Sequence, residues 1–142
     1  MKQKTALLLS PSLLVFLVLL VGCSSNLTLV AERTINNDVR LPIDIIMVED
    51  AASVLAIGPD SWFGHPQREK LTLDDELIRL SFSGGERMDY KLSLGSKIDK
   101  LIIFADFINQ EDRKQQQVVI PRSRFGFSKE VRIGKDALEM KE

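Results

Sequence analysis

The amino-acid sequence predicts an all-β protein, an antiparallel β-sandwich with one or two short helical turns. Seven or eight short runs of apolar and β-forming residues follow one another, separated by turn signals at regular intervals. This spacing is typical of a sandwich. No helix of ordinary length separates the runs, which argues against a parallel α/β fold. Residues 23–142 are enough for one domain with its own hydrophobic core.

The N-terminal segment has the pattern of a secretory signal peptide. Lys2 and Lys4 precede an apolar run from Leu13 to Val21, and a charged start before an apolar stretch marks such signals. The run is shorter than the roughly 20 residues that a comfortable bilayer span needs. We therefore predict that residues 1–22 are a signal peptide.

The end of this run resembles the bacterial lipobox. Leu20, Val21 and Gly22 lead into Cys23, the only cysteine of the chain. The resemblance implies that the Cys23 thiol accepts a diacylglycerol and that Cys23 becomes the first residue of the mature protein. Its acyl chains, palmitate among them, then hold the protein at a membrane. Each buried methylene contributes about 0.8 kcal/mol to the free energy of membrane binding. An ordinary signal anchor with an unrelated cysteine is the alternative, and the position of the lone cysteine argues against it.

The residue after Cys23 bears on the destination. Ser24 stands there. In the families that this motif resembles, aspartate favours retention in the inner membrane, whereas serine allows export to the outer membrane. We expect a lipid-anchored protein on the periplasmic face of the outer membrane, with outer-membrane lipids as one partner. Residues 23–26 are expected to be the lipidated tether and residues 27–142 the sandwich domain.

The expected elements follow in order along the mature chain. We expect strands at residues 27–31, 43–48, 79–82, 88–94, 100–107, 118–120 and 129–133, with residues 71–73 open to either a strand or a helix. Alanine density favours a short helix at residues 50–57, and an acidic start favours a helical turn at residues 74–77. Asn, Asp and Gly indicate turns at residues 36–38, 83–86 and 95–97, and loops are expected at residues 61–70 and 109–117.

No catalytic or metal-binding pattern emerges from the sequence. His65 is the only histidine, and no G-x-S-x-G nucleophile elbow accompanies it. A zinc site needs more His or Cys than the mature chain offers. Asp74, Asp75 and Glu76 match no calcium loop and fit the start of a helical turn. We expect no enzyme, no cofactor and no metal site.

The charge of the mature chain argues against a nucleic-acid partner. Removing Lys2 and Lys4 leaves 17 basic and 20 acidic side chains, a formal charge of −3. Nucleic-acid binding requires a basic footprint, which this balance does not provide.

Trp62 and Phe63 form an aromatic pair in the predicted loop. They either close the open end of the sandwich or anchor a partner, because Trp is enriched at interface hot spots. We favour the first interpretation.

The order of these features resembles the type VI secretion outer-membrane lipoproteins of the TssJ/SciN family. The likeness covers most of the mature chain, from Leu27 to Ile133. It depends on the lipobox, a first strand, an asparagine-containing turn and later stretches: P-I-D-I-I-M-V at residues 42–48, S-G-G-E at 83–86, Y-K-L-S-L at 90–94 and L-I-I-F-A-D-F at 101–107. Residues 58–70 have no counterpart in the family's pattern.

The resemblance implies a transthyretin-like β-sandwich at the inner face of the outer membrane. Such a protein anchors a trans-envelope complex by binding the periplasmic C-terminal region of the inner-membrane component TssM. In the family the contact involves the loop between the first two strands. In this sequence that loop is Asn36, Asn37, Asp38, Val39 and Arg40.

Two other functions stay open. A pilotin or assembly lipoprotein of another envelope machine shares the lipid anchor but binds a different partner, typically a secretin tail. A periplasmic enzyme or small-ligand binder is the third interpretation. The single histidine and the lack of paired acid and base groups argue against an enzyme.

Overall fold

The computed structural model describes residues 25–109, 112–123 and 127–141. The predicted signal peptide at residues 1–22 and the predicted lipidation site Cys23 lie outside these residues. The strands of the described part are β1 Ser25–Ala31, β2 Leu41–Ile46, β3 Leu77–Phe82, β4 Arg87–Leu92, β5 Lys100–Ala105, β6 Gln117–Pro121, β7 Ser128–Ile133 and β8 Leu138–Lys141. Its helical elements are η1 Asn36–Asp38, α2 Ala51–Ile57, α3 Pro59–Trp62, η2 Arg68–Lys70 and η3 Arg113–Gln116.

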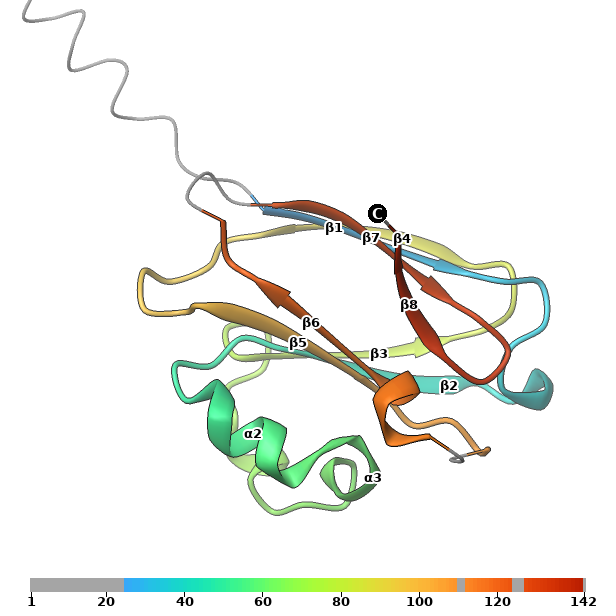
Figure 1. Ribbon diagram of the computed structural model, residues 1–142, viewed down its shortest axis with the longest axis horizontal. Coiled ribbons are helices and arrows are strands. Elements are labelled where there is room, and N and C mark those ends of the chain that lie inside the picture. Colours follow the sequence, from blue (N-terminus) through green and yellow to red (C-terminus); the bar gives the residue numbers. More distant parts are fainter. Residues whose placement is uncertain (1–24, 110–111, 124–126, 142) are drawn as a thin grey trace, which may run out of the picture.

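The strands form two four-stranded sheets that pack face to face (Figure 1). One sheet has the order β4-β1-β7-β8, and the other has the order β3-β2-β5-β6. Among the described strands, neighbours are antiparallel except β1 and β7, which run parallel. The predicted all-β sandwich is confirmed, with this pair as a departure from a purely antiparallel arrangement.

The core between the sheets follows from the alternation of side chains along each strand. In β1, Leu27 and Leu29 are fully buried, while Thr28 between them is only half-buried on the outer face. β2 and β5 differ, because nearly every residue is buried on either face. They are the two central strands of their sheet, as their continuous apolar runs predict.

The chain between β2 and β3 covers the outer face of this second sheet (Figure 1). Asp50 begins α2 by accepting a hydrogen bond from the Ser53 backbone N–H at 3.2 Å. Gly58, with φ 74°, turns the chain from α2 into α3, a conformation that glycine adopts without strain. Pro59 then occupies the first position of α3, where its missing N–H costs nothing. The predicted helix at residues 50–57 is confirmed as α2.

Trp62 ends α3 and belongs to a second apolar cluster, between these helices and the sheet. Its side chain is fully buried, and its ring meets Phe104 of β5 edge-on, with 5.9 Å between the centroids. Both expectations for Trp62 were therefore wrong. It covers the outer face of a sheet rather than the open end of the sandwich, and it is not exposed to a partner.

Three other expectations also need correction. The predicted loop at residues 61–70 contains the end of α3 and all of η2. The predicted helical turn at residues 74–77 is a non-helical turn in which Asp74 has φ 67°. The sequence also missed β8. Leu138 is the only buried residue of that strand, so its alternation is too short to be recognised.

The turn between β3 and β4 packs closely on the chain that follows β1. A Cβ atom built on Gly84 would lie 2.1 Å from the Arg33 carbonyl oxygen. Gly85, with φ 79°, donates its backbone N–H to the Glu32 carbonyl at 2.7 Å. The predicted Ser-Gly-Gly-Glu turn is confirmed, and its first glycine is required by the close approach of two backbones.

We expect Gly84→Ala to lower the free energy of unfolding by roughly 2 kcal/mol or more, because one of the two backbone segments has to move. Gly64→Ala is the matched control, since a Cβ there meets nothing within 4 Å. That control should change stability by less than about 1 kcal/mol. Urea unfolding of both variants measures the difference. Equal midpoints would contradict the close packing of the two segments.

Candidate functional site

Four connections gather where β1, β3, β5 and β7 finish, and we call this the distal end of the sandwich (Figure 1). We call the opposite end, where β1 starts at Ser25, the proximal end. β1 has seven residues, so the two ends are separated by about 20 Å along that strand. The five predicted partner-binding residues all lie in the β1–β2 connection at the distal end.

Asn36 ties three of these connections together. Its side chain is only 2% exposed. The side-chain Nδ2 donates to the Val39 carbonyl at 3.3 Å within its own loop, and Oδ1 accepts the Ile108 backbone N–H at 2.7 Å from the chain after β5. Its backbone N–H donates to the Lys135 carbonyl at 2.9 Å in the β7–β8 turn. A buried amide whose groups are paired in this way fixes the loop against its neighbours.

The backbone of this loop has an uncommon conformation. Asn36, Asn37 and Asp38 have φ values of 47°, 53° and 61°. Asn and Asp adopt this left-handed region more readily than other residues with side chains. The three residues therefore form a compact turn that suits their composition, as the sequence predicted.

Arg40 joins the loop to the β3–β4 turn. Its guanidinium donates to the side-chain hydroxyls of Ser81 and Ser83, both at 2.9 Å, and lies 3.9 Å from a Glu86 carboxylate oxygen. The side chains of Asn36 and Arg40 therefore hold the β1–β2 loop in place against the neighbouring connections. Asn37, Asp38 and Val39 are exposed, as is Arg40 despite its hydrogen bonds to the β3–β4 turn.

The structure adds Ile108 to this end, a residue that the sequence did not single out. Ile108 is 58% exposed and Val39 is 52% exposed. Both are hydrogen-bonded to Asn36 through their backbones, so two exposed apolar side chains flank the same buried amide. Exposed apolar groups that lie together favour burial against a partner. Ile108 directly follows Phe107, at the end of the most apolar segment after Cys23, so its exposure had no clear signal in the sequence.

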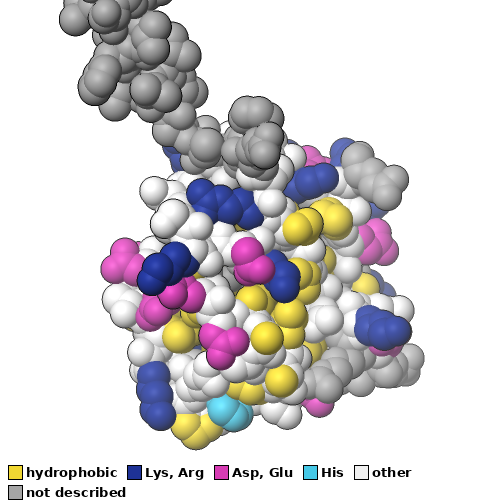
Figure 2. Space-filling view, turned by 60° about the vertical axis from the view of Figure 1, so that its left-hand side comes forward, with side chains coloured by type: hydrophobic (Ala, Val, Ile, Leu, Met, Phe, Trp, Pro, Cys, Tyr) yellow, Lys and Arg dark blue, Asp and Glu magenta, His cyan; other side chains and the backbone are white. Residues whose placement is uncertain are grey.

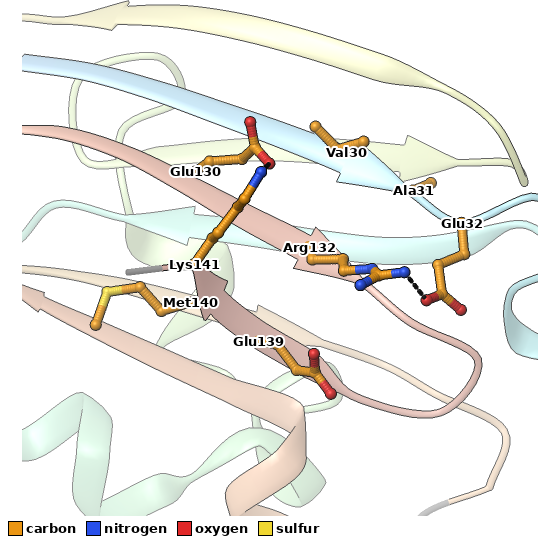
Figure 3. Close-up of a pocket in the computed structure, with 8 residues that line it drawn as sticks. All are labelled: Val30, Ala31, Glu32, Glu130, Arg132, Glu139, Met140 and Lys141. Carbon is orange, nitrogen blue, oxygen red and sulfur yellow. Dashed lines mark hydrogen bonds and ion pairs between the residues drawn. The ribbon is translucent and has the colours of Figure 1, made fainter.

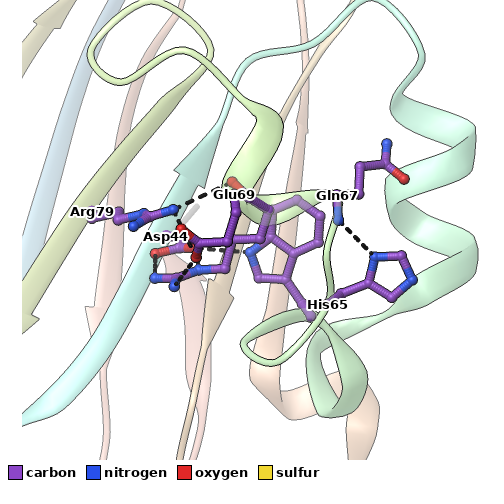
Figure 4. Close-up of polar contacts among 7 residues, drawn as sticks. Asp44, His65, Gln67, Glu69 and Arg79 are labelled. Carbon is purple, nitrogen blue, oxygen red and sulfur yellow. Dashed lines mark hydrogen bonds and ion pairs between the residues drawn. The ribbon is translucent and has the colours of Figure 1, made fainter.

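A second polar cluster lies under the α2–α3 cover (Figure 4). Asp44 points from β2 away from the core and is 1% exposed. Its carboxylate accepts from Trp62 Nε1 at 2.8 Å and from the Arg68 Nε and Nη2 at 2.6 and 3.1 Å. The hydrogen bond to Asp44 raises the pKa of the Arg68 guanidinium above its ordinary value. Every acceptor in this cluster is used, so its role is structural.

The other candidate residues also have local roles. His65 Nδ1 accepts the Gln67 backbone N–H at 3.2 Å (Figure 4). Glu76 accepts the Thr72 backbone N–H at 2.9 Å. The described residues contain no group of three or more His, Cys, Asp or Glu side chains that could hold a metal ion. Within the same residues, no helix is long and apolar enough to cross a membrane.

A shallow hollow of about 380 Å³ lies on the outer face of β1, β7 and β8 (Figure 3). Its charged side chains neutralise one another. Arg132 pairs with Glu32 at 2.7 Å, and Lys141 pairs with Glu130 at 3.2 Å. Glu139, which also lines the hollow, is left without an ion pair among the described residues, and a single exposed carboxylate is too little to select a ligand.

No family model matches the sequence, and no curated protein does. Solved structures do match. The chain aligns with the T6SS lipoprotein TssJ1 from Pseudomonas aeruginosa at a TM-score of 0.67 and 14% identity, over 84% of this chain and 95% of that one. The alignment with Serratia marcescens Lip, a membrane-bound component of the Type VI Secretion System, has a TM-score of 0.62 and 12% identity. It covers 84% of this chain and 97% of Lip. The alignment with a chain of the structure described as the T6SS protein TssM C-terminal domain from EAEC has a TM-score of 0.65 and 14% identity. It covers 84% of this chain and 98% of that one.

These similarities show that the chain has a TssJ-like β-sandwich fold, as the resemblance in the sequence implied. The alignments cover nearly the whole length of the matched chains, so the likeness concerns the complete sandwich.

We expect Asn36→Ala to lower the free energy of unfolding by roughly 2–4 kcal/mol, because it leaves the Ile108 N–H unpaired and places alanine in the left-handed region. Asn37→Ala is the control, with a similar φ but an exposed side chain. It should cost only about 1 kcal/mol. Thermal unfolding gives the stabilities, and amide hydrogen exchange at Ile108 reports the lost bond. Unchanged exchange at Ile108 in Asn36→Ala would contradict the role assigned to the amide.

We expect Arg68→Ala to cost about 3–5 kcal/mol, because it leaves the Asp44 carboxylate buried without its cation. Arg132→Ala is the matched control. Its ion pair with Glu32 is almost as short but lies on the exposed outer face, so its removal should cost at most about 1 kcal/mol. Urea denaturation compares the two. Similar losses would mean that Asp44 is not buried in solution.

Proposed function

We propose that this chain is an outer-membrane lipoprotein that anchors a type VI secretion trans-envelope complex. In this proposal Cys23 carries the lipid, and the distal end binds the periplasmic C-terminal region of a TssM-like inner-membrane component. The protein performs no catalysis and works as a scaffold. The fold shared with TssJ1 and Lip supports the assignment, as does the structure described as a TssM C-terminal domain.

The observation that carries the proposal is the placement of the β1–β2 loop. β1 begins only two residues after Cys23, and its seven residues lead directly away from that point to the distal end (Figure 1). A lipid on Cys23 would hold the proximal end at the membrane surface. The loop would then lie at the part of the domain farthest from that surface, where a protein from the other membrane can reach it.

The properties of the distal end suit a binding face. The loop is rigid because Asn36 and Arg40 secure it to its neighbours, so little conformational entropy is lost when a partner binds. It displays Asn37, Asp38 and Val39, with Ile108 alongside. An apolar centre with polar groups at its margin is the usual composition of a protein interface.

We expect Val39→Asp to weaken binding of the TssM-like periplasmic region by at least about tenfold, because a charge replaces an apolar contact at the centre of the face. Leu73→Asp is the matched control, since Leu73 is 55% exposed but lies before β3 at the proximal end. Neither variant should change the melting temperature much. Binding is measured by titration of the purified lipoprotein with the partner region.

Three results would count against this face. Equal affinity of Val39→Asp and Leu73→Asp for the partner region would mean that the interface does not include Val39. Failure of the unmodified protein to bind any TssM-like region would remove the proposed partner. Recovery of a secretin instead, after crosslinking in the native envelope, would favour the pilotin interpretation.

We expect Cys23→Ser to release the protein from the membrane fraction while its thermal unfolding stays the same, because the acyl chains would be attached through the Cys23 sulfur, before the first described strand. Fractionation of the envelope followed by detection of the protein makes the measurement. If the released form still supports assembly of the secretion complex, tethering is not part of its role.

A further inference from the structure

The proximal end carries basic side chains on both sides of the start of β1 and after the end of β6. Lys91 is exposed and pairs in register with Asn26, the second residue of β1. Lys129 pairs in register with Leu27 on the other side of β1. Arg122 follows β6 at the same end and donates to the Ile98 carbonyl at 3.2 Å. We call Lys91, Arg122 and Lys129 the basic rim.

No carboxylate among the described residues lies within ion-pair distance of Lys91, Arg122 or Lys129. Two other lysines at this end are neutralised. Lys97 lies 3.6 Å from Glu49, and Lys100 lies 3.7 Å from Asp99. The basic rim therefore retains three uncompensated positive charges.

The acidic groups of the proximal end lie on the side of the other sheet. Asp74, Asp75 and Glu76 immediately precede β3, at one edge of that sheet, whereas Lys91 and Lys129 flank β1 and Arg122 follows β6, at the opposite edge from β3. Packed sheets are about 10 Å apart, which is comparable to the Debye length at physiological salt. Figure 2, in which this end comes forward, shows Lys and Arg side chains along its upper edge, with carboxylates and further Lys and Arg side chains lower down. The unpaired basic side chains and the acidic turn therefore lie apart at this end.

The length of chain before β1 brings the basic rim to a membrane surface. Only Ser24 stands between Cys23 and Ser25, the first residue of β1. Two residue steps span at most about 7 Å. A domain held by a lipid on Cys23 thus keeps the rim within a few ångströms of the phospholipid headgroups, where basic side chains are attracted to anionic lipids.

We propose that the basic rim is a membrane-contact surface that binds anionic phospholipid headgroups and sets the orientation of the tethered domain. The inference rests on the proposed lipidation of Cys23. With the rim on the bilayer, the acidic turn at residues 74–76 is turned away from it by repulsion. The distal end then faces away from the membrane in one preferred orientation, instead of swinging about a short tether.

The test uses the purified acylated protein in two kinds of vesicle, phosphatidylcholine alone and phosphatidylcholine with phosphatidylglycerol. Lysines are acetylated briefly, and the labelling rate of each is obtained by mass spectrometry. We expect the labelling rates of Lys91 and Lys129 to be roughly fivefold lower in the anionic vesicles than in the neutral ones. This factor corresponds to the attraction of one basic side chain to an anionic membrane surface. Lys135, exposed in the β7–β8 turn at the distal end, should be labelled equally in both. High salt should remove the difference.

Two charge-reversal variants sharpen the test. Lys91→Glu should reduce the protection of Lys129 in anionic vesicles, whereas Lys135→Glu, which makes the same change of charge at the distal end, should leave it intact. Equal labelling of Lys129 in the two vesicle types, or protection that does not depend on lipid charge, would overturn the proposal. Flotation of the protein with the vesicles is recorded in the same samples. If it does not float, the lipid anchor and this inference both fall; if it floats without protection of the rim, only this inference falls.

Discussion

The burial of β2 on both faces is the constraint on which the rest of the structure depends. One face of β2 packs against the other sheet, and the opposite face needs a cover of its own. That cover is the chain from α2 to η2. It brings Trp62 and Arg68 to the one polar group on the covered face, Asp44. Because a buried carboxylate is costly without partners, the ion pair fixes where the cover lies.

The same strand also positions the distal end. β2 begins immediately after the β1–β2 loop, so its place in the sheet sets one end of that loop, and β1 sets the other. Asn36 then locks the loop to the chain after β5 and to the β7–β8 turn. A single residue serves three connections because its side-chain donor, its side-chain acceptor and its backbone N–H point to different segments. The exposed residues beside it are therefore displayed on a rigid base.

The two ends of the sandwich differ in the character of their surfaces. The distal end combines a rigid polar loop with exposed Val39 and Ile108. The proximal end carries the unpaired charges of the basic rim. Apolar contact and charge attraction select different partners, a folded protein surface in one case and a charged surface in the other. This division suits the proposed role of a scaffold between two envelope components.

The sequence by itself determined the fold class, the strands at residues 43–48 and 100–107 and the turns at residues 36–38 and 83–86, because alternation and turn chemistry are local properties. The parallel pairing of β1 with β7, the strand β8 and the place of Trp62 were decided only by the tertiary structure. The first and the last depend on contacts between segments far apart in the chain, whereas β8 pairs with the adjacent β7 and has too few buried residues to be recognised. Tertiary structure also decided which residues of the loop are buried and which are exposed. Asn36 is buried because its side chain accepts the backbone N–H of Ile108, 72 residues later, which needs an acceptor.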